Sequence, residues 1–195
     1  MAVINTLVEG LLDAAIAARL IGVAGHDCGT SYGKKGSGYI KNKIRSFNSS
    51  AQAGYYLALV DFMDTHENCP ANVVSKWLPN KHPKMLFRVV VREIESWLLA
   101  DRNGLASYLG INAKNIPGNP ERILDPKIMI VNLARNSRNR FVRTNLVPNE
   151  GSTAQVGKLY LSEMQRFVND KWDISAARNN ARSLDKCLKV LEEVV

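Results

Sequence analysis

Apolar residues in the first half of the chain form short unbroken runs that alternate with segments of helical composition. Three of these runs are rich in β-branched side chains and short enough to be strands buried on both faces; they are residues 3–8, 55–60 and 85–91. Helices are predicted between and after them, from Ala and Leu content and from Pro at helix starts and stops, for residues 11–21, 39–47, 70–79 and 92–101. This alternation predicts an α/β fold in which a mostly parallel sheet is flanked by helices.

The second half of the chain shows no convincing strand pattern. Residues 111–126 are rich in Pro, Asn and Gly, which predicts a connector. Helices are predicted for residues 127–137, 157–170 and 181–194. We therefore expect an α/β domain over residues 1–110, the connector over residues 111–126, and a basic helical C-terminal extension over residues 127–195 that packs on the first domain.

Six glycines between residues 22 and 38 predict a long loop. The loop lacks the G-x-x-x-x-G-K-[ST] spacing of a nucleotide-binding P-loop. Three interpretations stay open for it. Its backbone N–H groups, together with Lys34 and Lys35, could approach a phosphate, it could be a mobile lid, or it could be a plain solvated loop.

The chain is basic, with 26 Lys and Arg against 18 Asp and Glu and a pI near 9.5. This balance favours a polyanionic partner such as DNA or RNA. Two stretches, residues 34–45 and 135–143, hold basic residues and no acid. The candidate nucleic-acid-binding residues are Lys34, Lys35, Lys41, Lys43, Arg45, Arg135, Arg138, Arg140 and Arg143. The arginines could equally bind an acidic partner protein.

The composition also restricts where the protein acts. Hydrophobic residues make up 46% of the chain, enough for a folded core. No apolar run reaches the roughly 18 to 20 residues that span a bilayer, and the start of the chain lacks a signal-peptide pattern. The three cysteines are far apart and odd in number, which argues against a disulfide framework. We expect a cytoplasmic protein with no membrane partner.

Acidic residues follow each of the three predicted strands. Glu9 follows the first, Asp61 follows the second, and Glu93 comes two residues after the third. Ligands of parallel α/β sheets bind beyond the carboxyl ends of the strands. Carboxylates that gather there repel one another unless a cation neutralises them, and Mg²⁺ prefers such oxygen ligands. The alternative is purely structural, because an acid at a strand end or in a first helical turn is also favourable without any ligand.

Three motifs resemble the Toprim superfamily, which includes the catalytic domains of topoisomerases and primases and the overcoming-lysogenization-defect nucleases. They are VEG at residues 8–10, LVDFMD at residues 59–64 and VVVREIESWLLAD at residues 89–101. The resemblance covers about residues 1–110. Within the superfamily, the third motif is similar to a branch of small uncharacterised bacterial proteins. Members of this branch are often encoded beside ABC-type ATPases, and several such pairs are suspected phage-defence systems.

The resemblance implies roles for particular acids. Glu9 matches the Toprim glutamate, a general acid/base or metal ligand, and Asp61 and Asp64 fall where Toprim domains carry an Asp-x-Asp metal motif. Here the two aspartates are three residues apart, so they converge only if the chain turns after Asp61. Glu93 and Glu95 match the branch signature. The implied catalytic set is Glu9, Asp61, Asp64 and Glu93, and the implied ligands of Mg²⁺ or Mn²⁺ are Glu9, Asp61, Asp64 and Glu95.

Two functional hypotheses follow from the resemblance and the charge. The first is a metal-dependent nuclease that cleaves phosphodiester bonds of DNA or RNA, as the effector of a phage-defence system with an ATPase partner. The second is a non-catalytic Toprim-like subunit that binds an ABC-type ATPase or nucleic acid and uses its carboxylates structurally. A homo-oligomer is compatible with either hypothesis.

Overall fold

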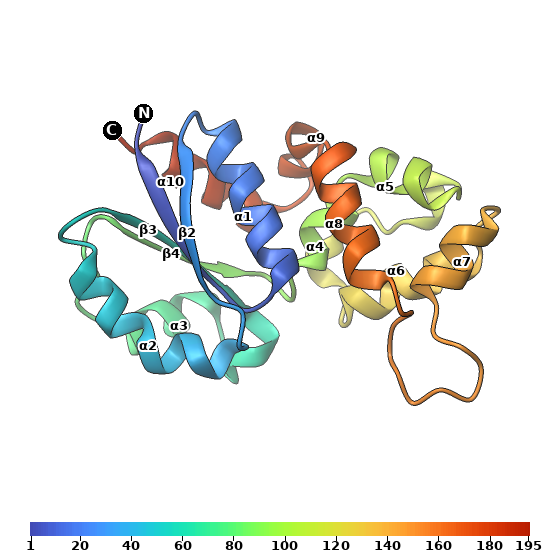
Figure 1. Ribbon diagram of the computed structural model, residues 1–195, viewed down its shortest axis with the longest axis horizontal. Helices are drawn as coiled ribbons and strands as arrows, with labels where there is room; N and C mark the ends of the chain where they lie inside the picture. Colours follow the sequence, from blue (N-terminus) through green and yellow to red (C-terminus); the bar gives the residue numbers. More distant parts are fainter. The chain divides into compact units, whose positions relative to one another are not determined.

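The computed structural model describes all residues from 1 to 195, and the chain forms two compact units (Figure 1). The first unit comprises Met1–Val91 and Ser183–Val195, and the second comprises Arg92–Arg182. Residues 92–110, expected in the first domain, thus lie in the second unit, and the end of the chain lies in the first.

A sheet of four parallel strands forms the centre of the first unit. Its strands are β1 (Val3–Val8), β2 (Asp27–Gly33), β3 (Tyr55–Asp61) and β4 (Met85–Val90), in the order β2-β1-β3-β4. All three pairings are parallel, so the carboxyl ends of the strands share one edge. The predicted α/β class with a parallel, helix-flanked sheet is confirmed.

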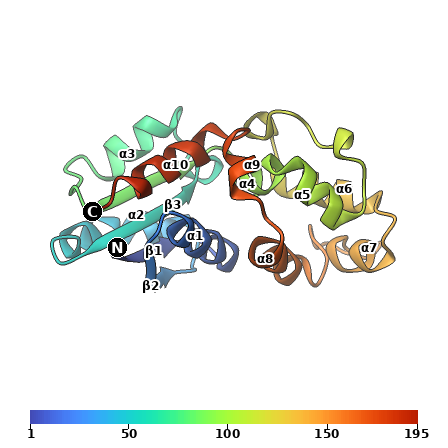
Figure 2. The same cartoon turned by 90° about the horizontal axis from the view of Figure 1, so that it is seen from above.

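Helices cover both faces of this sheet (Figures 1 and 2). They are α1 (Leu11–Val23), α2 (Ser37–Ser50), α3 (Pro70–Trp77) and α10 (Arg182–Glu192), of which α10 belongs to the first unit from Ser183 onward. Helices α2 and α3 lie on one face, and α1 and α10 lie on the other. The predicted strands 3–8, 55–60 and 85–91 and the predicted helices 11–21, 39–47, 70–79 and 181–194 all correspond to these elements.

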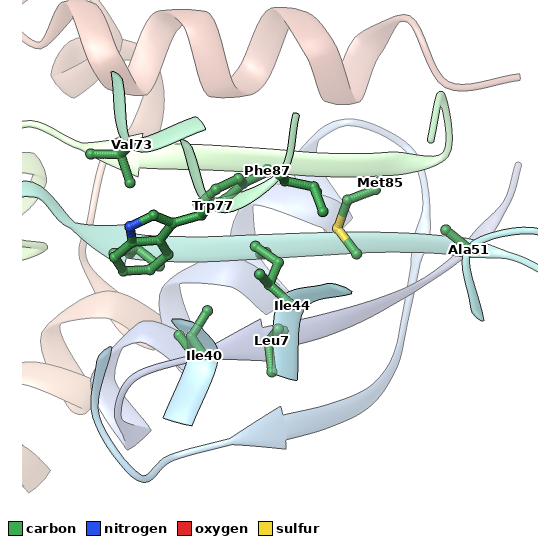
Figure 3. Close-up of a cluster of buried hydrophobic side chains, with 11 residues drawn as sticks. Leu7, Ile40, Ile44, Ala51, Val73, Trp77, Met85 and Phe87 are labelled. Atoms are coloured by element: carbon green, nitrogen blue, oxygen red, sulfur yellow. The ribbon is translucent and has the colours of Figure 1, made fainter. Parts of the chain in front are cut away.

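The core under α2 and α3 follows from the two-residue period of the strands (Figure 3). Alternate strand residues such as Leu7, Ala58 and Phe87 point to this face and are buried. Ile40 and Ile44, four residues apart on one side of α2, pack against them. Each fully buried aliphatic or aromatic side chain of this kind stabilises the fold by about 1.5–3 kcal/mol.

Strand β2 corrects the expectation of a continuous loop over residues 22–38. Its sequence, DCGTSYG, is polar and contains two glycines, so it has no apolar signature. It is nevertheless a strand, because an edge strand needs only one neighbour, and β1 provides the backbone pairing. The ring of Tyr32 also packs against Phe47 and Tyr56, with centroid distances of 5.1 and 6.4 Å.

The second unit is helical. Its helices are α4 (Glu95–Ala100), α5 (Arg102–Leu109), α6 (Pro126–Arg135), α7 (Arg140–Leu146), α8 (Tyr160–Asp170) and α9 (Ile174–Arg178). Every residue of α4 is buried, and Trp97 is fully enclosed by the helices around it. The predicted connector contains only two short 3-10 turns, η2 (Ala113–Asn115) and η3 (Pro120–Arg122). None of the helices in either unit combines the length and the apolar character needed to cross a bilayer.

Candidate functional site

The carboxyl ends of β1 and β3 bring two of the predicted site residues together. The strands are neighbours in the sheet, with Leu7 paired to Ala58, so Glu9 and Asp61 follow at the same edge. The backbone N–H of Asp61 donates a hydrogen bond to Glu9 Oε1 at 2.7 Å. Asp61 itself is 8% exposed. The Glu9 carboxylate is thus held against the backbone of Asp61, the residue that carries the second carboxylate.

A third acid of the first unit, Asp13, was missing from the predicted site. It lies in the first turn of α1 and is 6% exposed. Its Oδ2 lies 3.1 Å from the position that a Cβ on Gly10 would take, so the carboxylate points back toward the start of the helix. The signal in the sequence is an acid in the first turn of the helix predicted for residues 11–21, where the helix dipole favours negative charge.

The chain turns directly after Asp61, as convergence of Asp61 and Asp64 requires. A short 3-10 helix, η1 (Phe62–Thr65), begins at the next residue. Asp64 lies within it and is exposed. Glu67, further along, forms an ion pair with Lys76 at 2.6 Å.

The donor chemistry at this edge suits a hard divalent cation, because Glu9, Asp13 and Asp61 offer only carboxylate oxygens. The structure does not gather three or more acidic, histidine or cysteine side chains into a ready ligand set anywhere in the chain. Magnesium sites, however, typically use one or two protein carboxylates and take the remaining ligands from water and substrate phosphate. The pair of Glu9 and Asp61 fits that smaller requirement.

The basic loop after β2 borders the same edge. The backbone N–H of Lys34 donates to the carbonyl oxygen of Val8 at 2.8 Å, and that of Gly36 donates to the carbonyl oxygen of Glu9 at 3.0 Å. Lys34 takes a left-handed conformation with φ 63° and, like Lys35, is exposed. Glu9 therefore lies between the end of β3, which carries Asp61, and a loop that presents two lysines.

The remaining basic residues of the first stretch lie on α2. Lys41, Lys43 and Arg45 are all exposed. The ammonium group of Lys41 lies 5.5 Å from the centre of the Trp77 ring, and Arg45 Nε donates to the Trp77 carbonyl oxygen at 3.5 Å. Both contacts lie at the protein surface, and the three side chains stay exposed. They give α2 a basic face.

The acids of the third motif belong to the second unit. Glu93 and Glu95 are 6% and 1% exposed. Glu93 Oε2 accepts a hydrogen bond from the backbone N–H of Lys127 at 3.2 Å. Glu95 Oε1 lies 3.7 Å from Lys127 Nζ and accepts from the Tyr160 hydroxyl at 3.3 Å. The two glutamates thus join α4 to α6 and α8, a set of partners that no local sequence pattern predicts.

Tyr160 shows how strongly this cluster is desolvated. Burial raises the pKa of its phenol well above the usual value, and the nearby charges of Glu95 and Glu93 raise it further. The hydroxyl therefore keeps its proton and acts as a hydrogen-bond donor.

The arginines of the second stretch divide into exposed and anchored side chains. Arg135, Arg138 and Arg140 are exposed. Arg143 is half-buried, and its guanidinium donates to the carbonyl oxygen of Ser137. Three of the four thus remain available to bind a polyanion, and the fourth holds the start of α7.

The chain matches no protein-family model, no curated protein and no solved structure with which it was compared.

Proposed function

We propose that the first unit is a Toprim-like, metal-dependent nuclease whose site lies at the carboxyl edge of its parallel sheet. The observation that carries the proposal is the position of Glu9, between Asp61 at the end of β3 and the Lys34–Gly36 loop after β2. Carboxylates that can hold a cation and lysines that can bind phosphate thus border one strand end. A phosphodiester substrate requires both.

In this proposal, Glu9 and Asp61 hold Mg²⁺ or Mn²⁺, with Asp13 and Asp64 as further oxygen donors. Such a bound ion supplies Lewis-acid stabilisation of charge on a phosphoryl oxygen and lowers the pKa of its water. The hydrogen bond from Asp61 N–H fixes the orientation of the Glu9 carboxylate. Lys34, Lys35 and the basic face of α2 attract and position the nucleic-acid backbone through charge, which is salt-dependent. An ABC-type ATPase, the partner implied by the resemblance, would provide the trigger in a phage-defence system.

The test compares Glu9→Gln with the wild type and with Glu193→Gln, a matched change of an exposed acid in the same unit. Purified proteins are incubated with single-stranded DNA, with plasmid DNA and with RNA, in Mg²⁺, in Mn²⁺ and in EDTA. We expect cleavage that requires the metal, is lost in Glu9→Gln and is unchanged in Glu193→Gln. Calorimetric titration with Mn²⁺ should show weaker binding for Glu9→Gln alone.

A second candidate function has its own supporting observation. The Glu9 carboxylate already serves as the acceptor for a backbone N–H, which is a structural use of the side chain. In a non-catalytic subunit, this hydrogen bond would be the whole role of Glu9. Absence of cleavage, together with Mn²⁺ binding that is the same in Glu9→Gln and wild type, would favour this alternative over the nuclease.

A further inference from the structure

A pocket in the second unit has no role in the proposed catalysis. It has a volume of about 200 Å³ and is lined by residues of α5, α7 and α8 and the residues that flank them. Pockets for drug-sized ligands usually measure about 300–1,000 Å³, so this one suits a smaller group such as a single planar ring.

An exposed aromatic side chain, Phe141, lines this pocket. Its exposed fraction is 52%, although the next residue, Val142, is buried. The backbone at this residue is anchored, since the N–H of Phe141 donates to Asn139 Oδ1 at 2.9 Å. The preceding segment is tied to the end of α5, because Arg138 N–H donates to the carbonyl oxygen of Gly110 at 3.2 Å. The backbone that carries Phe141 is therefore held in place, and it presents the aromatic ring at the protein surface.

The polar lining of the pocket carries both signs of charge. Arg166 and Lys171 supply donors, and Glu163 and Asp170 supply acceptors. Arg166 Nε lies 3.9 Å from Asp170 Oδ2, and the Tyr108 hydroxyl lies 2.7 Å from Glu163 Oε2. Two cations and two carboxylates balance each other, so the pocket itself does not select a bare phosphate. A neutral ring with donors and acceptors along its edge fits this lining.

The surroundings of the pocket add positive charge. Arg138 and Arg140 are exposed, and they lie in the same short segment as Phe141. A chain that carries planar bases on a phosphate backbone matches both features, since unstacked bases bind aromatic platforms while Arg and Lys contact the phosphates.

We infer that this pocket binds one unpaired base of single-stranded DNA or RNA, with Phe141 stacking on the base and Arg138 and Arg140 contacting the flanking phosphates. The inference rests on the proposed function in so far as it names the substrate class of that nuclease. A duplex is disfavoured, because its bases are stacked inside the helix and cannot enter a pocket without being extruded.

Fluorescence anisotropy with labelled oligonucleotides tests this inference in EDTA, so that binding is measured without metal or cleavage. The probes are single-stranded DNA, single-stranded RNA, the same strands with abasic residues, and the matching duplex. The variants are Phe141→Ala, Phe141→Trp and, as a matched control, Leu159→Ala, which removes another exposed apolar side chain of the second unit. Circular dichroism melting confirms that each variant is folded.

We expect Phe141→Ala to weaken binding of an intact single strand about tenfold, in keeping with the loss of one base stack. Its affinity for the abasic strand should equal that of the wild type, and Phe141→Trp should restore binding to the intact strand. Comparing the affinities for single-stranded DNA and single-stranded RNA shows which of the two nucleic acids the protein prefers. An unchanged affinity in Phe141→Ala, or an equal loss for intact and abasic strands, would overturn the inference.

The same strands separate this inference from the nuclease proposal. Glu9→Gln should keep the difference in affinity between intact and abasic strands that Phe141 creates, because Phe141 and its pocket lie in the second unit and Glu9 lies in the first. A wild-type protein that binds through Phe141 but never cleaves would refute the nuclease alone. Cleavage that is indifferent to Phe141→Ala, with unchanged binding, would refute the base pocket alone.

Discussion

The hydroxyl of Tyr108 joins α5 to α8, and Tyr108→Phe removes that single group. The hydroxyl lies 2.7 Å from Glu163 Oε2 and 3.0 Å from the Glu163 carbonyl oxygen. The tyrosine ring also packs against Phe167, with a centroid distance of 5.3 Å, and phenylalanine keeps this contact. The variant therefore isolates one hydrogen bond to a carboxylate that is 8% exposed.

The cost of the change can be worked out from this geometry. Hydrogen bonds to charged groups contribute about 1.5–3 kcal/mol to stability. Tyr108 is only half-buried, so water can replace part of the lost interaction, and we expect a loss of about 1.5–2 kcal/mol. With a urea m-value of about 2 kcal/mol/M, the unfolding midpoint should fall by about 0.75–1 M.

The pH dependence gives a second, independent readout. Burial and the hydrogen bond to Glu163 raise the pKa of Tyr108 above its usual value. Above about pH 10, the unfolded chain loses the phenolic proton and the folded chain keeps it, so stability falls by up to about 1.4 kcal/mol per pH unit. Phenylalanine lacks this proton, so the stability gap between wild type and Tyr108→Phe should be full below about pH 10 and should narrow above it.

Urea unfolding of both proteins at neutral and at alkaline pH, followed by circular dichroism, measures both effects. Tyr39→Phe is the control: phenylalanine keeps the contact of the ring with Lys35 Nζ, so the midpoint should shift very little. A Tyr108→Phe midpoint equal to that of the wild type at neutral pH would show that water replaces the bond completely. A stability gap that widens with pH would refute the assigned direction of the pKa shift.

Two further changes test other parts of the first unit. Burial raises the pKa of the fully enclosed Cys187 thiol to about 12, although Arg88 opposes the shift. The thiol of the unfolded chain deprotonates first, above about pH 8.5, so the stability of the wild type should decline there more steeply with pH than that of Cys187→Ala. Urea titrations at several pH values measure the two slopes, and equal slopes would contradict this prediction. Gly33 has φ 93°, and a Cβ there would clash with the carbonyl oxygen of Val8, so Gly33→Ala should lower the melting temperature and displace the Lys34 loop from Glu9. Gly38→Ala, which meets open space, is the matched control, and equal melting temperatures for the two variants would count against the clash.

The apolar runs predicted three of the four strands because buried strands are recognisable by composition alone. Strand β2 was not predicted, because an edge strand can be polar when its neighbour supplies the pairing. Helices α5, α7 and α9 were also not predicted, and their lengths of 8, 7 and 5 residues explain why. A helix this short has about two turns or fewer, so its hydrophobic period cannot be recognised in the sequence. Such helices are stabilised by tertiary packing rather than by helix propensity.

The candidate site likewise has features that the sequence predicts and features that depend on residues far apart in the chain. The meeting of Glu9 and Asp61 could be predicted, because parallel strands end at one edge and each acid follows its strand. The partners of Glu95 could not be predicted, since Lys127 and Tyr160 lie 32 and 65 residues further along the chain. The left-handed conformation of Arg92, with φ 69°, lies where the second unit begins, and no pattern around it indicates this.

The position and surroundings of the two groups of acids decide which of them suits a metal ion. Glu95 has a lysine ammonium 3.7 Å away and a tyrosine hydroxyl donor, so a cation is already part of its surroundings. A divalent ion would have to compete with Lys127 for that carboxylate and would repel its charge. Glu9 instead lies at the carboxyl edge of the sheet, where its Oε1 accepts a hydrogen bond from the backbone N–H of Asp61. Ligands of parallel α/β sheets bind at this edge, so Glu9 and Asp61 are the better candidates for metal ligands. Glu93 and Glu95 are better explained as the links between α4 and α6, so changes there should affect folding of the second unit before they affect catalysis.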